Sequence, residues 1–135
     1  MCIRDRLDVN FRKLGINTIF VVAPSTTDDR LKKVTSISSG FVYAASLMGV
    51  TGTRTAISNS AKELVSRVRK VTHLPVAVGL GVSTPEQARE VAQYADGVII
   101  GSALIKLLLD TDLATGLTAL SELAKSLVSA TRGAR

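Results

Sequence analysis

The sequence predicts an α/β fold in which four parallel strands alternate with helices and a further helix follows at the carboxyl end. Four short apolar segments, each followed by a helical pattern of apolar residues, carry this prediction. The run at residues 76–78 has no polar alternation, which is typical of a strand covered on both faces. Strict alternation of strand and helix requires right-handed crossovers, and therefore a single parallel sheet.

The first unit follows six residues, MCIRDR, that show neither periodicity nor a capping pattern. We expect residues 1–6 to be a leader foreign to the fold and residues 7–135 to form the folded part. Leu7, Phe11 and Leu14 keep helical spacing before Gly15, a residue suited to a helix end. Residues 18–23 (TIFVVA) form the first expected strand, and a helix then starts near Asp28, with apolar residues at helical spacing: Leu31, Val34 and Ile37.

The second unit begins with a strand over residues 41–46 (FVYAAS), after Gly40 has ended the preceding helix. A loop rich in glycine and threonine is expected from residue 49 to about residue 59. Ser60 and Glu63 have the spacing of a capping box, so we expect the next helix to begin there. Its apolar face consists of Leu64, Val65, Val68 and Val71.

The third and fourth units carry the clearest local signals. After residues 76–78, Thr84 is placed as an N-cap, Pro85 at the first helical position and Gln87 three residues after the cap. The fourth strand, residues 98–100, runs directly into Gly101 and Ser102. Helices are expected over residues 103–109 and 113–128, the latter with four residues pointing inward: Leu117, Leu120, Ala124 and Leu127.

Glycine follows both of the last two strands, and this pattern is compatible with a phosphate site. A glycine has no Cβ, so its backbone N–H can approach an anion closely, and a helix start adds positive potential. Ser102 adds a hydroxyl donor. Tight turns alone would also explain these glycines, so the residues by themselves leave both interpretations open.

Composition excludes several function classes. The chain has 135 residues, 46% of them hydrophobic, which argues against disorder. No apolar run is long enough to span a bilayer and no signal-peptide layout is present, so we expect a soluble, cytoplasmic protein. A single cysteine, Cys2, and a single histidine, His73, make zinc chemistry and a serine–histidine triad poor candidates. The net charge of +6 is dispersed and aromatic residues make up 4%, which disfavours nucleic-acid binding.

The carboxyl ends of the strands receive almost no ionisable groups. The carboxylates fall in the leader, at helix starts, on helix surfaces or, for Asp96, at the opposite end of a strand. The residues expected at the carboxyl ends can bind an oxyanion and pack against a ring, but they offer no general base. They are Tyr43, Ser46, Thr51, Gly52, Arg54, Gly81, Ser83, Gly101 and Ser102.

Three motifs together resemble a known family. They are G-V-T-G at residues 49–52, G-L-G-V-S-T-P at residues 79–85, and D-G-V-I-I-G-S-A at residues 96–103. In this order they resemble the carboxyl-terminal half of the tryptophan synthase alpha chain, over roughly residues 7–110. The resemblance implies a truncated (β/α)8 TIM barrel, with the four strands here corresponding to strands five to eight.

The resemblance also implies a function. The family is a lyase of tryptophan biosynthesis that cleaves indole-3-glycerol phosphate to indole and glyceraldehyde 3-phosphate by a retro-aldol step, with no cofactor of its own. It works with a beta chain in an α2β2 heterotetramer. By position, the residues implied to bind substrate are Tyr43 at the indole pocket, Thr51 on the mobile loop, and the phosphate cradle of Gly52, Gly81, Gly101 and Ser102. Val21 corresponds to another wall of the pocket.

The family's catalytic glutamate and aspartate lie on and after its second strand, before the part that this sequence resembles. The resemblance therefore implies a fragment that binds phosphate and is inactive alone, with no catalytic residue assigned. Two alternatives stay open: another phosphate-binding barrel enzyme, which the G-V-T-G-x-R loop disfavours, and a non-catalytic phosphate-binding half-barrel that pairs with a second copy or a beta chain.

Overall fold

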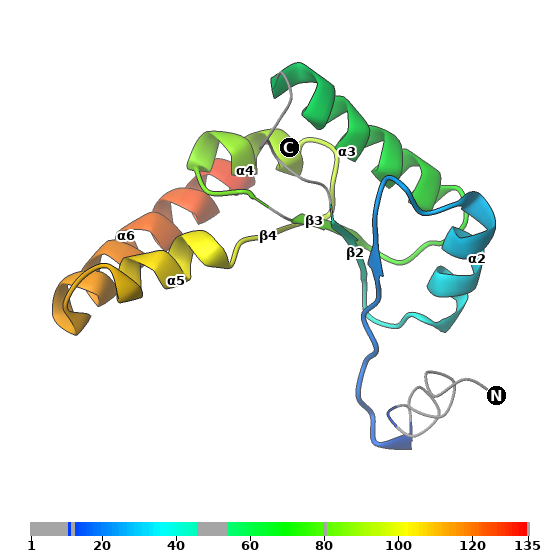
Figure 1. Ribbon diagram of the computed structural model, residues 1–135, viewed down its shortest axis with the longest axis horizontal. Coiled ribbons are helices and arrows are strands. Elements are labelled where there is room, and N and C mark those ends of the chain that lie inside the picture. Colours follow the sequence, from blue (N-terminus) through cyan, green and yellow to red (C-terminus); the bar gives the residue numbers. More distant parts are fainter. Residues whose placement is uncertain (1–10, 12, 46–53, 80, 135) are drawn as a thin grey trace.

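The computed structural model describes residues 11, 13–45, 54–79 and 81–134. Within them, four parallel strands form one sheet in sequence order: β1 (Val21–Val22), β2 (Val42–Ala45), β3 (Val76–Gly79) and β4 (Gly97–Ile99). The helices are α2 (Asp28–Ile37), α3 (Arg54–Arg69), α4 (Pro85–Ala92), α5 (Ser102–Leu109) and α6 (Leu113–Arg132). Figure 1 shows the helices in an arc around the sheet. The predicted parallel α/β arrangement with a carboxyl-terminal helix is confirmed.

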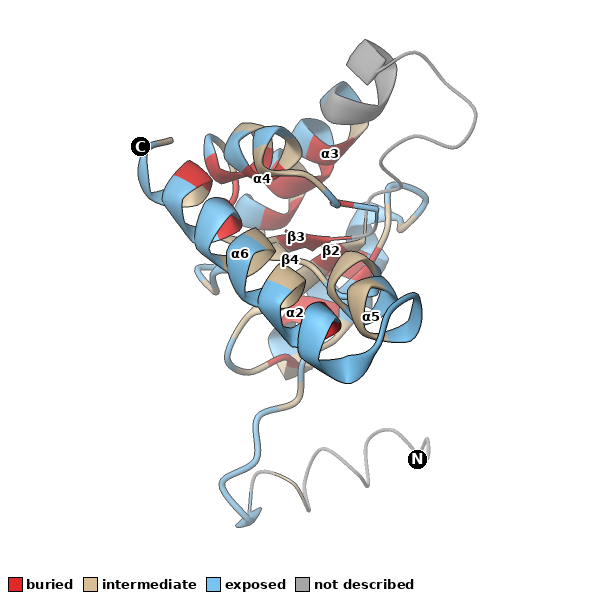
Figure 2. Cartoon of the chain, turned by 90° about the vertical axis from the view of Figure 1, so that its left-hand side faces the viewer, coloured by how far each residue is buried: buried red, intermediate tan, exposed pale blue. Residues whose placement is uncertain are grey.

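The helix face of the sheet, meaning the side against α2, α3 and α4, holds the core. Val42, Ala44, Val76 and Val78 alternate along β2 and β3 and have no exposed surface. They belong to one cluster with apolar side chains from the three helices, and Figure 2 shows this buried centre. The cluster's helix residues include Leu31, Leu64, Val68, Ala88 and Val91.

The inner face, meaning the opposite side of the same strands, is much less covered. Tyr43, Ala45 and Ala77 are half-buried there, and 58% of Val21 is exposed. The register pairs Val21 with Tyr43 and Tyr43 with Ala77, so these residues form a row across three strands. Within the described residues, the inner face is therefore the less buried side of the sheet.

Helix α4 begins as the sequence predicts. The Thr84 side chain accepts a hydrogen bond from the Gln87 backbone N–H, and the Gln87 side chain accepts one from the Thr84 N–H, at 3.3 and 3.2 Å. Such a reciprocal cap satisfies two N–H groups that a helix start leaves without partners. The predicted apolar stripe of Ala88, Val91 and Ala92 is buried.

The start of α3 differs from the prediction. The helix begins at Arg54, six residues before the expected capping box, so Ser60 and Glu63 lie inside the helix. No proline or glycine lies between Arg54 and Ser60 to stop the helix from extending backward. A serine three residues before a glutamate thus resembles a helix start without being one.

Two further expectations need correction. Only Val21 and Val22 of residues 18–23 are paired as β1, because in the described residues this strand has β2 as its sole neighbour. On α6, Leu127 is buried as predicted, but 51% of Leu117 is exposed. The inward position near the start of that helix is Gly116 instead.

Gly116 allows α5 and α6 to lie in close contact. A Cβ at this position would lie 2.8 Å from the Leu107 carbonyl oxygen and 3.0 Å from Thr111 Oγ1. Asp112 caps α6, because its Oδ1 accepts hydrogen bonds from the N–H groups of Ala114 and Thr115. The two helices therefore form a tight antiparallel pair after β4, as Figure 1 shows.

Candidate functional site

The carboxyl ends of β3 and β4 lie together at one edge of the sheet. The register pairs Gly79 with Ile99, so Gly81 and Gly101 each follow a paired residue by two positions. Gly81 has a φ of +81°, a left-handed conformation that side chains with a Cβ disfavour. The structure thus brings two of the predicted cradle glycines to one edge, and one of them is required by the backbone conformation.

Helix α5 begins directly at this edge. Gly101 is its N-cap, and the Gly101 carbonyl accepts hydrogen bonds from the N–H groups of Leu104 and Ile105 at 3.0 and 3.1 Å. Ser102 is the first helical residue and is exposed. A Cβ on Gly101 would meet no atom within 4 Å, so the space in front of this helix start is open. Backbone N–H groups at such a position attract anions.

Tyr43 lies across the inner face over the neighbouring strand. A Cβ on Gly79 would lie 2.9 Å from both Cε2 and Oη of Tyr43, and 2.8 Å from the Ile99 Cβ. Gly79 is the last residue of β3, as the sequence predicts, and its missing side chain leaves the room that the tyrosine ring occupies. The contact with Tyr43 was not predicted. The signal lies in the register and not in the local sequence.

The inner face beside Tyr43 is apolar. Val21 is its partner in β1 and Ala77 its partner in β3, and both lie on the same side of the sheet. The inner face thus carries the Tyr43 ring and the small apolar side chains of Val21 and Ala77, and the carboxyl edge with its glycines adjoins it. This arrangement can hold a planar aromatic group at one end and an oxyanion at the other.

Four predicted residues cannot be placed in this geometry. Thr51 and Gly52 lie outside the described residues, as does Ser46. Arg54 begins α3, but its side chain also falls outside the description. Their contribution to the site remains a prediction.

Ser83 belongs to the start of α4. Its N–H and its hydroxyl both donate to the Gln87 Oε1, at 2.8 and 3.2 Å. The side chain is thus engaged in the helix cap.

Asp96 lies at the opposite edge of the sheet, as expected. Its Oδ2 accepts a hydrogen bond from the Val76 N–H at 2.9 Å, and its Oδ1 pairs with Arg69 at 3.0 Å, at the amino ends of β3 and β4. Within the described part of the chain, no group of three histidine, cysteine, aspartate or glutamate residues could hold a metal ion. No described helix is long and apolar enough to cross a membrane.

A cavity of about 410 Å³ lies elsewhere, between α4, β4 and α6. Ala92, Val98 and Leu127 contribute to its lining, which is mostly apolar. Val98 and Ile100 also pack against the core cluster, so this cavity lies on the helix side of β4. It is separate from the carboxyl edge that carries Gly81 and Gly101.

Comparison with known proteins identifies the family. The tryptophan synthase alpha chain family matches residues 4–132. The alpha chain of Streptomyces avermitilis is 58% identical over 122 residues, which are 90% of this chain and 44% of that protein. The alpha chain of Mycobacterium avium is 54% identical over 118 residues, 87% of this chain and 42% of that protein.

Solved structures agree with these relatives. Mycobacterium tuberculosis tryptophan synthase superimposes with a TM-score of 0.82 at 45% identity, covering 96% of this chain and 48% of the other. The tryptophan synthase alpha subunit of Pyrococcus furiosus gives a TM-score of 0.77 at 33% identity, covering 92% and 49%. The chain thus spans a little under half the length of the proteins it resembles. Because the family matches residues 4–132 and these relatives share the parallel α/β fold, the chain belongs to the tryptophan synthase alpha chain family.

Proposed function

We propose that this chain supplies the phosphate-binding and indole-binding half of an indole-3-glycerol phosphate lyase. The complete enzyme cleaves this substrate by a retro-aldol step into indole and glyceraldehyde 3-phosphate, in tryptophan biosynthesis. The observation that carries the proposal is the shared carboxyl edge of β3 and β4, where Gly81 and Gly101 lie next to the start of α5.

In this proposal the substrate lies along the inner face. Its phosphate accepts hydrogen bonds from backbone N–H groups at Gly81, Gly101 and the first turn of α5, and from the Ser102 hydroxyl. The open space before Gly101 favours this position, and the helix start favours the negative charge. The indole packs against Tyr43, whose ring is held over Gly79. Gly52 completes the cradle, and Thr51 closes over the bound substrate.

The proposal assigns no proton transfer to this chain. Retro-aldol cleavage needs a group that removes the glycerol hydroxyl proton and one that protonates the indole ring. Asp28 lies at the start of α2, and Asp96 accepts a hydrogen bond at the amino edge of the sheet. We therefore infer that these residues bind substrate without cleaving it, and that the rest of the barrel provides the acid and the base.

A partner and a location complete the proposal. One solved relative is a tryptophan synthase of Mycobacterium tuberculosis. We propose that the complete alpha chain joins a tryptophan synthase beta chain in a cytoplasmic α2β2 complex and hands indole to it. The alpha chain itself needs no cofactor.

The test uses a completed chain, in which the amino-terminal part of the Streptomyces avermitilis alpha chain precedes the residues matched here. Gly101→Ala adds a methyl group to the open space before α5 without a steric clash within the chain. We expect it to weaken binding of glycerol 3-phosphate by roughly tenfold, about 1.4 kcal/mol, as measured by calorimetric titration.

The matched control is Gly133→Ala, at the end of α6, where the nearest atom to a new Cβ is 3.7 Å away. This variant should bind glycerol 3-phosphate like the unsubstituted chain. Equal affinities for the two variants would contradict the phosphate site. Indole release from indole-3-glycerol phosphate by the completed chain, and none by residues 1–135 alone, would support the assigned division of roles.

A further inference from the structure

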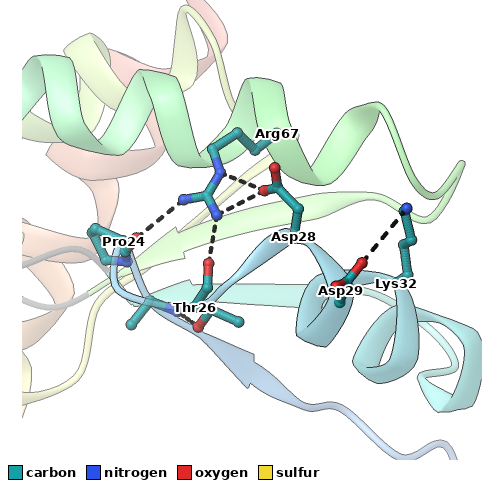
Figure 3. A network of polar contacts seen from close by, with 7 residues as sticks. Pro24, Thr26, Asp28, Asp29, Lys32 and Arg67 are labelled. Atoms are coloured by element: carbon teal, nitrogen blue, oxygen red, sulfur yellow. Dashed lines mark hydrogen bonds and ion pairs between the residues drawn. The ribbon is translucent and has the colours of Figure 1, made fainter.

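Arg67 binds the turn that follows β1. Its Nε donates to the Asp28 Oδ1 at 2.9 Å, its NH1 donates to the Pro24 carbonyl at 3.0 Å, and its NH2 donates to the Thr26 carbonyl. NH2 also pairs with Asp28 at 2.8 Å. Figure 3 shows the guanidinium of α3 reaching across to the turn. Each of its three nitrogens thus has a partner on a segment about forty residues earlier in the chain.

The turn also has hydrogen bonds of its own. The Thr26 hydroxyl accepts from the Ala23 N–H at 3.0 Å, and the Thr26 N–H donates to the Ala23 carbonyl at 2.8 Å. The Leu31 N–H donates to the Thr27 carbonyl at 2.8 Å and starts α2. These bonds shape the turn locally, whereas the hydrogen bonds from Arg67 tie residues 24–28 to α3.

This attachment matters because β1 is short. Two residues, Val21 and Val22, pair with β2. Val21 nevertheless forms the inner-face wall beside Tyr43, and it lies three residues before Pro24. A turn released from α3 would leave the carboxyl end of β1 less restrained, and with it the Val21 wall.

We propose that Arg67 is a positioning residue for the substrate pocket, which holds the Val21 wall against Tyr43 by fixing the turn at residues 24–28. The inference rests on the proposed function and adds to it a residue that lies outside the pocket. Arg67 does not touch the inner face; it acts through the turn. A guanidinium suits the task because its fork of donors serves two carbonyls and a carboxylate at once, which an ammonium cannot do.

The test compares Arg67→Ala with Arg69→Ala in the completed chain. Arg69 is on the same last turn of α3, but it pairs with Asp96 at the amino edge of the sheet. We expect Arg67→Ala to raise KM for indole-3-glycerol phosphate roughly fivefold, with kcat changed less than about twofold, because lost wall positioning weakens binding of substrate and transition state alike. Arg69→Ala should leave KM unchanged.

Two further readouts separate positioning from general stability or charge. Hydrogen exchange at the Ala23 and Leu31 amides should become about tenfold faster in Arg67→Ala and stay unchanged in Arg69→Ala. Arg67→Lys restores the charge but should keep most of the increase in KM. If Arg67→Lys has the KM of the unsubstituted chain, the proposed role of the forked guanidinium donors is overturned.

The outcomes distinguish this inference from the function on which it rests. If the completed chain is active and both alanine variants share one KM, the inference is overturned and the proposed function stands. Faster exchange at Ala23 without a change in KM also overturns it, because the turn then does not position the wall. A completed chain that releases no indole overturns the proposed function, and this inference with it.

Discussion

The helix face and the inner face belong to the same strands, yet they are built for different tasks. On the helix face, Val42, Ala44, Val76 and Val78 are fully buried against three helices. On the inner face, one tyrosine lies among small residues, and Val21 is 58% exposed. The comparison teaches that stability within this chain comes from one side of the sheet, while the other side is left shaped for a ligand.

The contributions of the two faces to stability can be compared by shortening one apolar side chain on each face. Leu64→Ala, in α3 on the helix face, should lower the free energy of unfolding by about 2–5 kcal/mol, because Leu64 is 1% exposed and no neighbour can fill the cavity fully. Val21→Ala on the inner face should cost less than about 1 kcal/mol. Urea unfolding of the 135-residue chain, followed by circular dichroism, measures both. Equal losses of unfolding free energy in the two variants would show that the inner face stabilises the chain as much as the core does.

Gly79→Ala should affect both stability and binding. The new methyl group would lie 2.8 Å from the Ile99 Cβ and 2.9 Å from Tyr43. Overpacking of this kind costs about 1–3 kcal/mol, and displacement of the ring should raise KM as well. Gly101→Ala serves as the comparison, since it meets no atom within the chain and should lower phosphate affinity with little loss of stability. A Gly79→Ala variant with unchanged KM would show that the ring position does not matter for substrate.

The smallest expected effect is on the helix side of the sheet, at Tyr94. Its hydroxyl is buried with no hydrogen-bond partner among the described residues, and burial, together with the charge of Glu90, raises its pKa to about 12. Tyr94→Phe removes an unsatisfied polar group and should be neutral or stabilising by up to about 1 kcal/mol.

The same substitution changes the pH dependence of stability. The unfolded chain loses the phenol proton near pH 10, whereas the folded chain keeps it to about pH 12, so the contribution of Tyr94 to stability falls as the pH rises through this window. The free energy of unfolding of Tyr94→Phe, measured between pH 9 and 12, should not show this decrease. An identical pH profile in the two proteins would place the hydroxyl in water.

Local chemistry made much of this fold predictable. Thr84, Pro85 and Gln87 define a helix start within four residues, and the structure forms the predicted capping box. The glycines after β3 and β4 were identified for the same reason, because a conformation such as that of Gly81 at φ +81° depends mainly on one residue. Whether Gly81 and Gly101 bind phosphate stays a prediction that the proposed experiments test.

Properties that depend on partners distant in sequence were harder to predict. Ser60 and Glu63 match a capping box but lie inside α3, because a helix start is set by what precedes it as well as by the motif. Gly79 ends β3 as predicted, but its contact with Tyr43 emerges only from the register of β2 and β3. Arg67 gave no local signal, since its partners lie about forty residues away.

The close contact at Gly116 has a consequence for how this protein can change over time. Because the α6 backbone lies against the Leu107 carbonyl with no room for a methyl group, α5 cannot shift independently of α6. We therefore expect a substitution that displaces α6 to displace α5, and with it Ser102. If the proposed anion site exists, its affinity would respond to substitutions that never meet the ligand.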